Sequence, residues 1–375
     1  MKLDLSQAVH YHTGKFPPSE FDYSVILPDL LEATDALARY DQMLQGMHNS
    51  EILLAPLRGQ ESLASSRMEG TFSTLEEILQ LQEESEGKDP GEIAKEYRSE
   101  AVETYLYSRS IKEAHRQLTE GYPLSESLIK RMHQLLLSFG RGTRKSPGEY
   151  KTEQNYIGTS GGSHVSFIPI SPERLSGGME SLLNYIADDS VPPLLRVAVC
   201  HLEFEALHPF KDGNGRVGRI LITLLLSHLK IISKPHFYIS RYFEEHKVDY
   251  IQIMRNVSAE DAWSPWTRFF LSAVTAQARQ NLAIAESIQS LYEEMKIRFS
   301  ELLASRYSTQ ALDYIFTNPV FRNSRFTNNS GIPKQTAARF TRVLLDHQLL
   351  ETKLEPSGRQ SAVYAFEPLL ELVRI

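Results

Sequence analysis

The chain has 375 residues and a formal net charge of −7 at pH 7, and 10% of its residues are aromatic. This length suffices for two or three domains that each bury a core, and the aromatic content excludes an intrinsically disordered chain. The negative charge argues against a protein that coats nucleic acid or an anionic membrane without sequence preference.

Nothing in the sequence predicts a membrane segment or a secreted protein. No apolar stretch of the signal-peptide type opens the chain. The most apolar segment, 220–232, is shorter than a bilayer span and contains Ser227, His228 and Lys230. The single cysteine, Cys200, lies in an apolar run and predicts a buried thiol in a reducing compartment. A soluble, cytoplasmic protein is therefore expected.

The N-terminal part of the chain predicts an extended segment followed by helices. Residues 1–27 show no clear periodicity, so an extended segment on the surface is expected there. From Leu30 the apolar residues recur at helical spacing, and the next helical stretch ends at Gly70. The run 73–76, Ser-Thr-Leu-Glu, predicts a capping box that opens another helix. The acidic stretch 82–92 predicts a loop.

The middle of the chain predicts helices interrupted by one hairpin. Helices are expected over 93–118 and 125–139. Two short β-prone runs around a glycine-rich turn at 159–162 predict a hairpin, whose second strand lies within 164–169. A buried helix over 191–207 follows, and it leads into a polar loop.

That polar loop, 208–219, reads HPFKDGNGRVGR and joins two apolar helical runs. A glycine-containing loop at a helix N-terminus gathers backbone N–H groups and suits an anion. Arg216 and Arg219 share a helical face and can grip oligophosphate oxygens, while Asp212 can hold a magnesium ion on the same phosphates. His208 is a candidate general base with an unperturbed pKa near ~6.5. A simple turn explains Asp-Gly-Asn-Gly alone, but not this convergence of an imidazole, a carboxylate and two guanidinium groups.

The loop resembles the signature of the Fic (Fido-domain) family, His-x-Phe-x-(Asp/Glu)-Gly-Asn-Gly-Arg-x-x-Arg. The fixed positions are matched by His208, Phe210, Asp212, Gly213, Asn214, Gly215, Arg216 and Arg219. The resemblance implies a mainly α fold, with a helical core, a β-hairpin flap and an N-terminal helical segment. It also implies transfer of AMP from ATP, with Mg²⁺, to a Ser, Thr or Tyr hydroxyl of a protein, and release of pyrophosphate. Intact Gly213 and Gly215 favour nucleotide transfer over phosphorylation, and Phe210 would anchor the loop in the core.

The resemblance assigns a role to each polar residue of the loop. His208 would take the proton from the incoming hydroxyl, and Asp212 would carry the magnesium ion. Arg216 and Arg219 would orient the β- and γ-phosphates. The remaining ATP-binding positions implied are Gly213, Asn214, Gly215, Val217 and Gly218. Tyr250 is expected to stack on or hydrogen-bond the adenine, although packing within the helix bundle explains it equally well.

The family resemblance extends to an inhibitory motif and to the flap. Ser65 to Gly70 fits the family's inhibitory pattern (Ser/Thr)-x-x-x-Glu-(Gly/Asn). Ser65 and Glu69 share a helical face, so Glu69 would pair with Arg219 in the place of the γ-phosphate of ATP; a solvent-facing glutamate at a helix end is the alternative. The hairpin resembles the flap that holds an extended piece of the target protein by strand addition. The expected flap residues are Val165, Ser166, Phe167 and Ile168.

The C-terminal residues, 305–375, predict a separate module. A helix over 308–316, a turn region at 326–331, a helix over 333–347 and a hairpin make a winged-helix pattern. Such a module can read DNA, or serve in protein docking or dimerisation. Its nine basic and six acidic residues leave a net charge of only +3, so DNA binding is not favoured. The DNA-reading candidates are Lys334, Gln335, Thr336 and Arg339.

Four segments and one leading function follow from these patterns. The segments are an N-terminal helical region at 1–110, a Fic core at 111–275, a connecting helix at 276–304 and the winged-helix-like module at 305–375. The predicted function is that of an auto-inhibited protein adenylyltransferase, a nucleotidyltransferase whose target can be the chain itself. The alternatives are removal of AMP by the same site, or a DNA-binding regulator with a Fic sensor domain. A homodimer is expected for this architecture, although no residue pattern identifies its interface.

Overall fold

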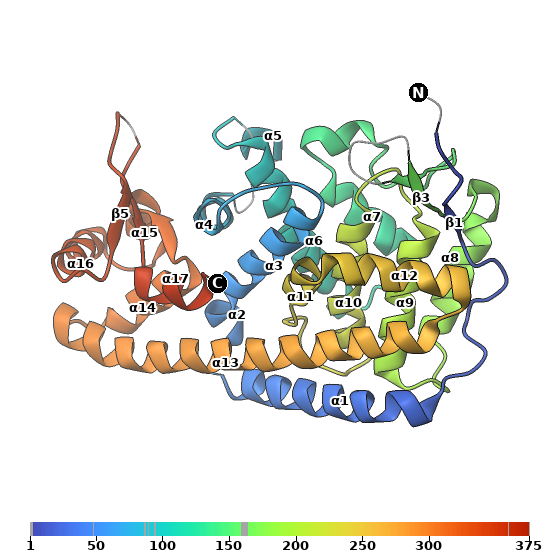
Figure 1. Ribbon diagram of the computed structural model, residues 1–375. Helices are drawn as coiled ribbons and strands as arrows, with labels where there is room; N and C mark the ends of the chain where they lie inside the picture. The colour runs from blue at the N-terminus through green and yellow to red at the C-terminus, as the bar shows by residue number, and fades with distance from the viewer. Residues whose placement is uncertain are drawn as a thin grey trace. The chain divides into compact units, whose positions relative to one another are not determined.

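The computed structural model describes residues 3–47, 49–85, 88, 90–93, 95–158, 164–358 and 360–374. Most of these residues are helical, which confirms the predicted mainly α fold (Figure 1). No helix among the described residues is both long enough and apolar enough to cross a membrane. The chain divides into two compact units, each assembled from separated stretches of sequence.

Unit 1 comprises Met1–Asp41, Ala64–Gly70 and Leu106–Arg279. It therefore contains both the signature loop and the motif at 65–70. The elements that lie wholly within it are β1 (Val9–His10), α7 (Glu126–Leu136), the 3-10 helix η1 (Gly140–Arg144), β2 (Ile157–Gly158), β3 (Val165–Ile168), α8 (Pro172–Ile186), α9 (Pro193–Leu207), α10 (Asn214–His228), α11 (Ser240–Glu245) and α12 (Lys247–Glu260).

Unit 2 comprises Gln42–Leu63, Thr71–Tyr105 and Gln280–Ile375. The elements that lie wholly within it are α2 (Ser50–Leu53), α4 (Leu75–Glu84), α5 (Pro90–Ile93), α14 (Ser308–Thr317), β4 (Val320–Arg322), α15 (Asn323–Asn329), α16 (Lys334–Asp346), β5 (Glu351–Leu354), β6 (Val363–Ala365) and α17 (Glu367–Val373). Four helices have residues in both units: α1 (Tyr23–Gly46), α3 (Ala55–Met68), α6 (Ser99–Thr119) and α13 (Trp263–Leu303). The four segments predicted from the sequence are continuous stretches of chain, whereas each compact unit combines separated stretches. The predicted segment boundaries therefore stay a prediction.

Helices α9 and α10 form the centre of unit 1. Nearly every residue of α9 from Leu194 to Leu207 is buried, and so is every residue of α10 from Arg216 to Leu226. A helix that is buried on all its faces belongs in a core, and the two apolar runs were predicted as buried helices for that reason. Trp266 of α13 is fully buried, and its Nε1–H donates to the carbonyl of Ala198 at 2.9 Å. The loop between α9 and α10 is therefore anchored at both ends by core helices.

A small sheet lies beside this core and includes part of the N-terminal segment. Its strand order is β1-β3-β2, and β3 pairs in parallel with β1 and antiparallel with β2. His12, just after β1, is buried, and its Nε2 lies 2.8 Å from Oε2 of buried Glu203. The expectation that 1–27 merely lies on the surface is therefore wrong around His12, because a buried carboxylate fixes it. The predicted hairpin turn at 159–162 lies outside the described residues.

The helix that follows the motif at 65–70 begins one residue later than predicted. The hydroxyl of Thr74 accepts the N–H of Glu77 at 3.2 Å, and the carboxylate of Glu77 accepts the N–H of Thr74 at 2.8 Å. These reciprocal bonds are a capping box at 74–77, and not the predicted one at 73–76. Ser73 instead donates its hydroxyl to that of Thr104 at 3.0 Å.

The C-terminal part of unit 2 contains three strands and two helices in addition to the two helices of a helix–turn–helix. The element order is α14, β4, α15, α16, β5 and β6, and the antiparallel sheet order is β4-β6-β5. The predicted helices and hairpin are thus present, while the assignment of the module as a winged helix stays a prediction. The predicted turn at 326–331 is wrong for its first residues, because α15 continues to Asn329; β4 and the terminal α17 were not predicted. Arg339, a predicted DNA-reading residue, donates through Nη2 to the carbonyl of Leu303 at 2.7 Å.

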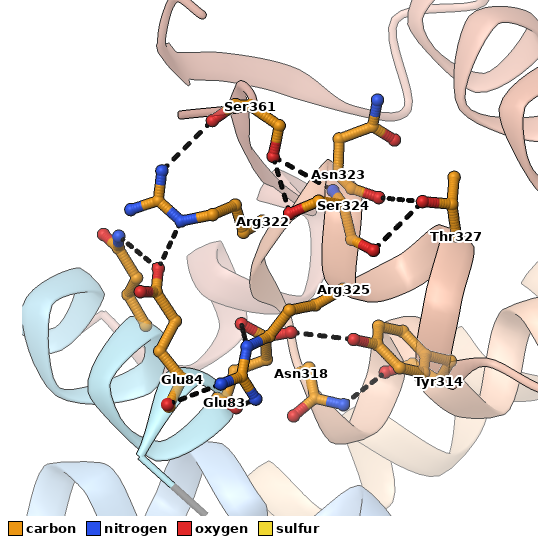
Figure 2. Close-up of polar contacts among 11 residues, drawn as sticks. Glu83, Glu84, Tyr314, Asn318, Arg322, Asn323, Ser324, Arg325, Thr327 and Ser361 are labelled. Atoms are coloured by element: carbon orange, nitrogen blue, oxygen red, sulfur yellow. Dashed lines mark hydrogen bonds and ion pairs between the residues drawn. The ribbon is translucent and has the colours of Figure 1, made fainter. Parts of the chain in front are cut away.

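Two arginines of this module hold the C-terminal end of α4 (Figure 2). Arg325 donates through Nη1 to the carbonyl of Glu83 and through Nη2 to that of Glu84, each at 2.7 Å. Arg322 donates through Nε to the Glu84 carboxylate at 2.9 Å, and the Tyr314 hydroxyl donates to the Glu83 carboxylate at 2.8 Å. The last carbonyls of a helix lack intrahelical partners, so Arg325 of α15 acts as a C-terminal cap, while Arg322 of β4 holds the Glu84 side chain.

The buried carboxyl of Glu83 makes the stability of the protein pH-dependent. Burial raises the pKa of Glu83 to about 7. An acid with a raised pKa in the folded state loses stabilisation as the pH rises from its unfolded pKa through its folded pKa. We expect Glu83 to lower the free energy of unfolding by about 3 kcal/mol between pH 4.5 and pH 8. Urea unfolding across this pH range should show a smaller decrease in the free energy of unfolding for Glu83→Gln than for wild type. For Glu355→Gln, at an exposed position, the decrease should equal that of wild type. An equal fall in wild type and Glu83→Gln would contradict the assignment.

Candidate active site

The signature loop begins with a left-handed residue that ends α9. His208 has φ 47° and ψ 60°, and its N–H donates to the carbonyl of Phe204 at 3.0 Å. Phe210 is fully buried and stacks on His133, with 3.7 Å between ring centroids. The side chain of Asn214 accepts the N–H of Phe210 and donates to its carbonyl, each at 2.8 Å. Phe210 thus anchors the loop in the core, and the side-chain amide of Asn214 holds the backbone of Phe210 through two hydrogen bonds.

Glycine is required at three positions of the loop for two different reasons. Gly213 has φ +78°, and its N–H donates to Oδ1 of Asp212 at 2.7 Å. A Cβ at Gly215 would lie 2.4 Å from Oε1 of Glu69, and one at Gly218 would lie 2.3 Å from Oε1 of Glu205. Gly213 therefore permits a conformation, while Gly215 and Gly218 permit close approach of two carboxylates.

Arg219 is enclosed by the last turn of α3. Its side chain is 2% exposed, its Nε donates to the hydroxyl of Ser65 at 2.8 Å and its Nη2 to the carbonyl of Ser65 at 2.9 Å. The same Nη2 donates to Oε1 of Glu69 at 2.7 Å. Burial is the largest single influence and acts to raise the pKa of Glu69, but the charge and hydrogen bond of Arg219, together with smaller contributions that include the Arg216 charge, hold that pKa below its usual value. The structure thus makes the contact that the spacing of Ser65 and Glu69 predicts.

Two further cations hold the end of α3 in place. Lys247 donates through Nζ to the carbonyl of Met68 at 2.7 Å. Arg141 donates through Nη2 to the carbonyl of Glu69 at 3.2 Å. Cations at a helix C-terminus satisfy its last carbonyls and interact favourably with its dipole. The position of the Glu69 carboxylate is therefore fixed from both its backbone and its side chain.

Arg216 and Asp212 form an ion pair within the same loop, in which Arg216 is buried and Asp212 is partly exposed. The Arg216 side chain is 2% exposed and that of Asp212 is 35% exposed, and 3.9 Å separates Nη2 of Arg216 from Oδ1 of Asp212. Groups of three or more potential metal ligands of the His, Cys, Asp and Glu types do not occur among the described residues. Asp212 therefore fits a magnesium ion only as a single carboxylate ligand, with phosphate oxygens and water completing the shell.

His208 is held in its neutral form. Burial and, next, the charge of Lys151 lower the pKa of His208 to about 4, and the carboxylates of Glu69 and Asp212 oppose this shift. Its Nδ1 has no hydrogen-bond partner among the described residues. A neutral imidazole with an available nitrogen can accept a proton at pH 7, which a general base must do.

A cavity of about 210 Å³ lies beside His208 and within unit 1. Its wall includes Glu69, residues of β3 and apolar residues of α12. Tyr250 lines the cavity and is 3% exposed. Its hydroxyl forms a hydrogen bond with Nε2 of His201 at 2.8 Å. Tyr250 also stacks on Phe243, with ring centroids 4.6 Å apart, so it packs in the bundle and faces the cavity at once.

The predicted flap strand is the central strand of its sheet. In β3, Val165 and Phe167 are buried, while Ser166 and Ile168 are half-buried. The hydroxyl of Ser166 donates to the carbonyl of Ile157 in β2 at 3.1 Å. Ser166 and Phe167 both line the cavity beside His208. The remaining predicted ATP-binding positions, Val217 and Gly218, lie on the buried side of α10.

Sequence reasoning missed two buried ionisable groups beside the loop. Burial raises the pKa of Glu205, which lines the cavity, to about 7. Burial also lowers the pKa of Lys151 to about 7. The signal for Glu205 is a glutamate within the apolar run 194–207, where an unpaired charge is costly. For Lys151 no local pattern distinguishes it from a surface lysine.

Comparison with known proteins gives consistent matches. Residues 123–226 match the Fic/DOC family, and residues 27–116 match the Fic/DOC family N-terminal region. Protein adenylyltransferase fic-1 of Caenorhabditis elegans is 32% identical over 101 residues, covering 26% of this chain and 18% of that protein. A probable protein adenylyltransferase of Aquifex aeolicus is 26% identical over 123 residues, covering 32% of this chain and 37% of that protein. The matched regions therefore span much less than two thirds of these relatives.

Solved structures share the fold at low sequence identity. A Fic family protein from Desulfovibrio desulfuricans G20 is 18% identical with a TM-score of 0.57, covering 94% of this chain and 98% of that one. A Fic domain-containing signaling protein from Bacteroides thetaiotaomicron is 19% identical with a TM-score of 0.52, covering 69% of this chain and 97% of that one. These likenesses show the fold, and the signature loop with the two family matches shows that the chain belongs to the Fic/DOC family.

Proposed function

We propose that the protein is a protein adenylyltransferase that is inhibited by its own Glu69. The observation that carries the proposal is the convergence, at one cavity wall, of neutral His208, buried Arg219 and the carboxylate of Glu69. The names of the adenylyltransferase relatives support the reaction type. ATP is the proposed nucleotide, and a protein hydroxyl is the proposed acceptor.

In the proposed reaction His208 removes the proton from a Ser, Thr or Tyr hydroxyl. The hydroxyl oxygen forms a bond to the α-phosphorus of ATP, the bond from that phosphorus to the bridging oxygen breaks, and pyrophosphate leaves. Arg216, and Arg219 once it is released, balance the negative charge of the phosphates through preorganised donors. Asp212 would hold Mg²⁺, which, when bound, would neutralise further phosphate charge.

The inhibition follows from the three bonds that Arg219 makes to Ser65 and Glu69. While these bonds persist, Arg219 cannot present the same N–H groups to a phosphate. The Glu69 carboxylate also places a negative charge where the phosphates of ATP would approach. The Arg219 guanidinium is buried, whereas the Glu69 side chain is 35% exposed, so ATP must displace a carboxylate that faces the open side of the pair.

The test is to replace Glu69 and look for AMP on protein. Glu69→Gly protein incubated with ATP and Mg²⁺ should gain the mass of one AMP on itself or on an added acceptor, while wild type gains little. Glu120→Gly is the matched control, because Glu120 also follows a helix end and pairs with an arginine, but on an exposed surface. Intact-protein mass spectrometry gives the result. A Glu69→Gly protein that labels nothing, itself included, would refute the proposal.

Removal of AMP from a modified protein is a second candidate for the same site. It is favoured by the position of Glu69 in the cavity wall near His208, where a carboxylate can orient a water molecule. Wild type would then release AMP from a premodified acceptor, and the Glu69→Gly protein would not. The homodimer, the cytoplasmic location and DNA binding by the C-terminal module remain predictions.

A further inference from the structure

A buried lysine lies against the backbone of the signature loop. Lys151 is 3% exposed, and its Nζ donates to the carbonyl of Leu207 at 3.0 Å and to Oδ1 of Asn155 at 2.9 Å. Its backbone N–H donates to the carbonyl of Pro209 at 2.8 Å. Lys151 therefore holds the carbonyl groups on both sides of His208.

Asn155 holds the two carbonyl groups that remain in this stretch. Its Nδ2 donates to the carbonyl of His208 at 3.3 Å and to that of Phe210 at 3.0 Å. Four consecutive carbonyl groups, 207–210, thus accept hydrogen bonds from Lys151 or Asn155. Because Nζ of Lys151 also binds Oδ1 of Asn155, the two residues form one rigid support.

The support formed by Lys151 and Asn155 stabilises the backbone at the junction of α9 and the signature loop. The last carbonyl groups of α9 have no partner within the helix, and they are buried. His208 has φ 47°, a left-handed conformation that is unfavourable for a residue with a Cβ. A cation at the C-terminal end of a helix satisfies its carbonyls and interacts favourably with its dipole. The strained backbone at His208 therefore persists because another segment of the chain determines it.

We propose that Lys151 and Asn155 are positioning residues that hold His208 in the geometry for proton transfer. The inference rests on the proposed function, in which His208 is the base. A general base must lie within hydrogen-bond reach of its proton, and a misplacement of about 1 Å can cost about 10²-fold in rate. The charge of Lys151 also helps to keep His208 neutral, against the opposing carboxylates of Glu69 and Asp212.

The experiment compares two Lys151 variants in the Glu69→Gly protein. Lys151→Met keeps the length of the side chain but removes its donor and charge, while Lys151→Arg keeps both. Labelling by ATP should be about 10²-fold slower at saturating ATP for Lys151→Met, with the KM for ATP changed less than about twofold. Lys151→Arg should recover at least a tenth of the parent rate. Lys145→Met, at an exposed lysine of the same segment, should label at the parent rate.

The split between kcat and KM separates positioning from a merely structural role. A structural role predicts that the KM for ATP, the melting temperature and kcat worsen together and that arginine gives no recovery; that result would overturn the inference. Should Lys151→Met melt well below the Glu69→Gly protein, Asn155→Ala, which removes three hydrogen bonds and no charge, is expected to show the same split between kcat and KM. If the Glu69→Gly protein labels and its Lys151→Met variant labels at the same rate, only this inference is overturned. If the Glu69→Gly protein labels nothing, the proposed function is overturned together with this inference.

Discussion

Replacing His208 by alanine in the Glu69→Gly protein should lower the rate of AMP transfer by about 10²–10⁴-fold, the usual contribution of a general base. The imidazole is neutral at pH 7, because burial and the charge of Lys151 lower the pKa of His208 to about 4. It lies in the wall of the same cavity as Arg219, so a hydroxyl and a phosphate can meet beside it. The rate is measured by transfer of α-labelled ATP to protein under conditions of excess nucleotide.

The control for this experiment is a second histidine of the same unit. His228 is exposed at the end of α10, and His228→Ala should label at the parent rate. ATP affinity should also stay close to that of the parent, since His208 acts on the acceptor and not on the phosphates. A His208→Ala protein that labels within about threefold of the parent would exclude His208 as the base, because a positioned base contributes at least about 10²-fold.

Replacing Trp266 by alanine should lower the free energy of unfolding by about 3–5 kcal/mol, the typical loss for a large aromatic residue in a core. Trp266 is fully buried and packs against the rings of His201 and Phe270. Its loss would also leave the buried carbonyl of Ala198 in α9 without its indole donor. Because α9 ends at Leu207, this core supports the catalytic loop directly.

Urea unfolding followed by circular dichroism measures this loss. Trp266→Phe retains most of the packing and loses only the hydrogen bond, so a loss of about 1–2 kcal/mol is expected. Phe72→Ala, at a side chain that is 64% exposed, should change stability by less than about 0.5 kcal/mol. A Trp266→Ala protein as stable as Phe72→Ala would show that α9 does not depend on this contact.

The features that could be predicted from the sequence are those that one local stretch determines. The loop 208–219 is bounded by two runs that are apolar on every helical face, so both its position and its burial follow from composition. Ser65 and Glu69 lie on one face of one helix, and their common approach to Arg219 follows once that face meets the loop. Periodicity predicted the buried helices, whereas the contact with Arg219 was implied by the resemblance of residues 65–70 to the family's inhibitory motif.

The features that could not be predicted depend on distant or equivalent partners. Asn155 and His208 are 53 residues apart, and no local pattern marks their contact. The sequence offers two equally good capping boxes, at 73–76 and 74–77, and the bond from Ser73 to Thr104 leaves only the second. Helix α15 has fewer than two turns and strand β4 has three residues. Both were missed because elements this short show too little periodicity in the sequence.

The arrangement of the flap sheet has a consequence for how targets reach the enzyme. β3 already has a neighbour on each side, and β1 and β2 are both edge strands of the described sheet, so an incoming peptide must displace one of them or pair with its outer edge. A strand that belongs to the chain competes with a dilute peptide at a high local concentration, so we expect addition to an outer edge, such as that of β2, rather than displacement. The segment that leads into β2 contains Asn155, which grips the backbone of His208. Binding of a target peptide at β2 would therefore be coupled to the orientation of His208. Because such coupling is reciprocal, a correctly oriented His208 would in turn increase the affinity for the peptide.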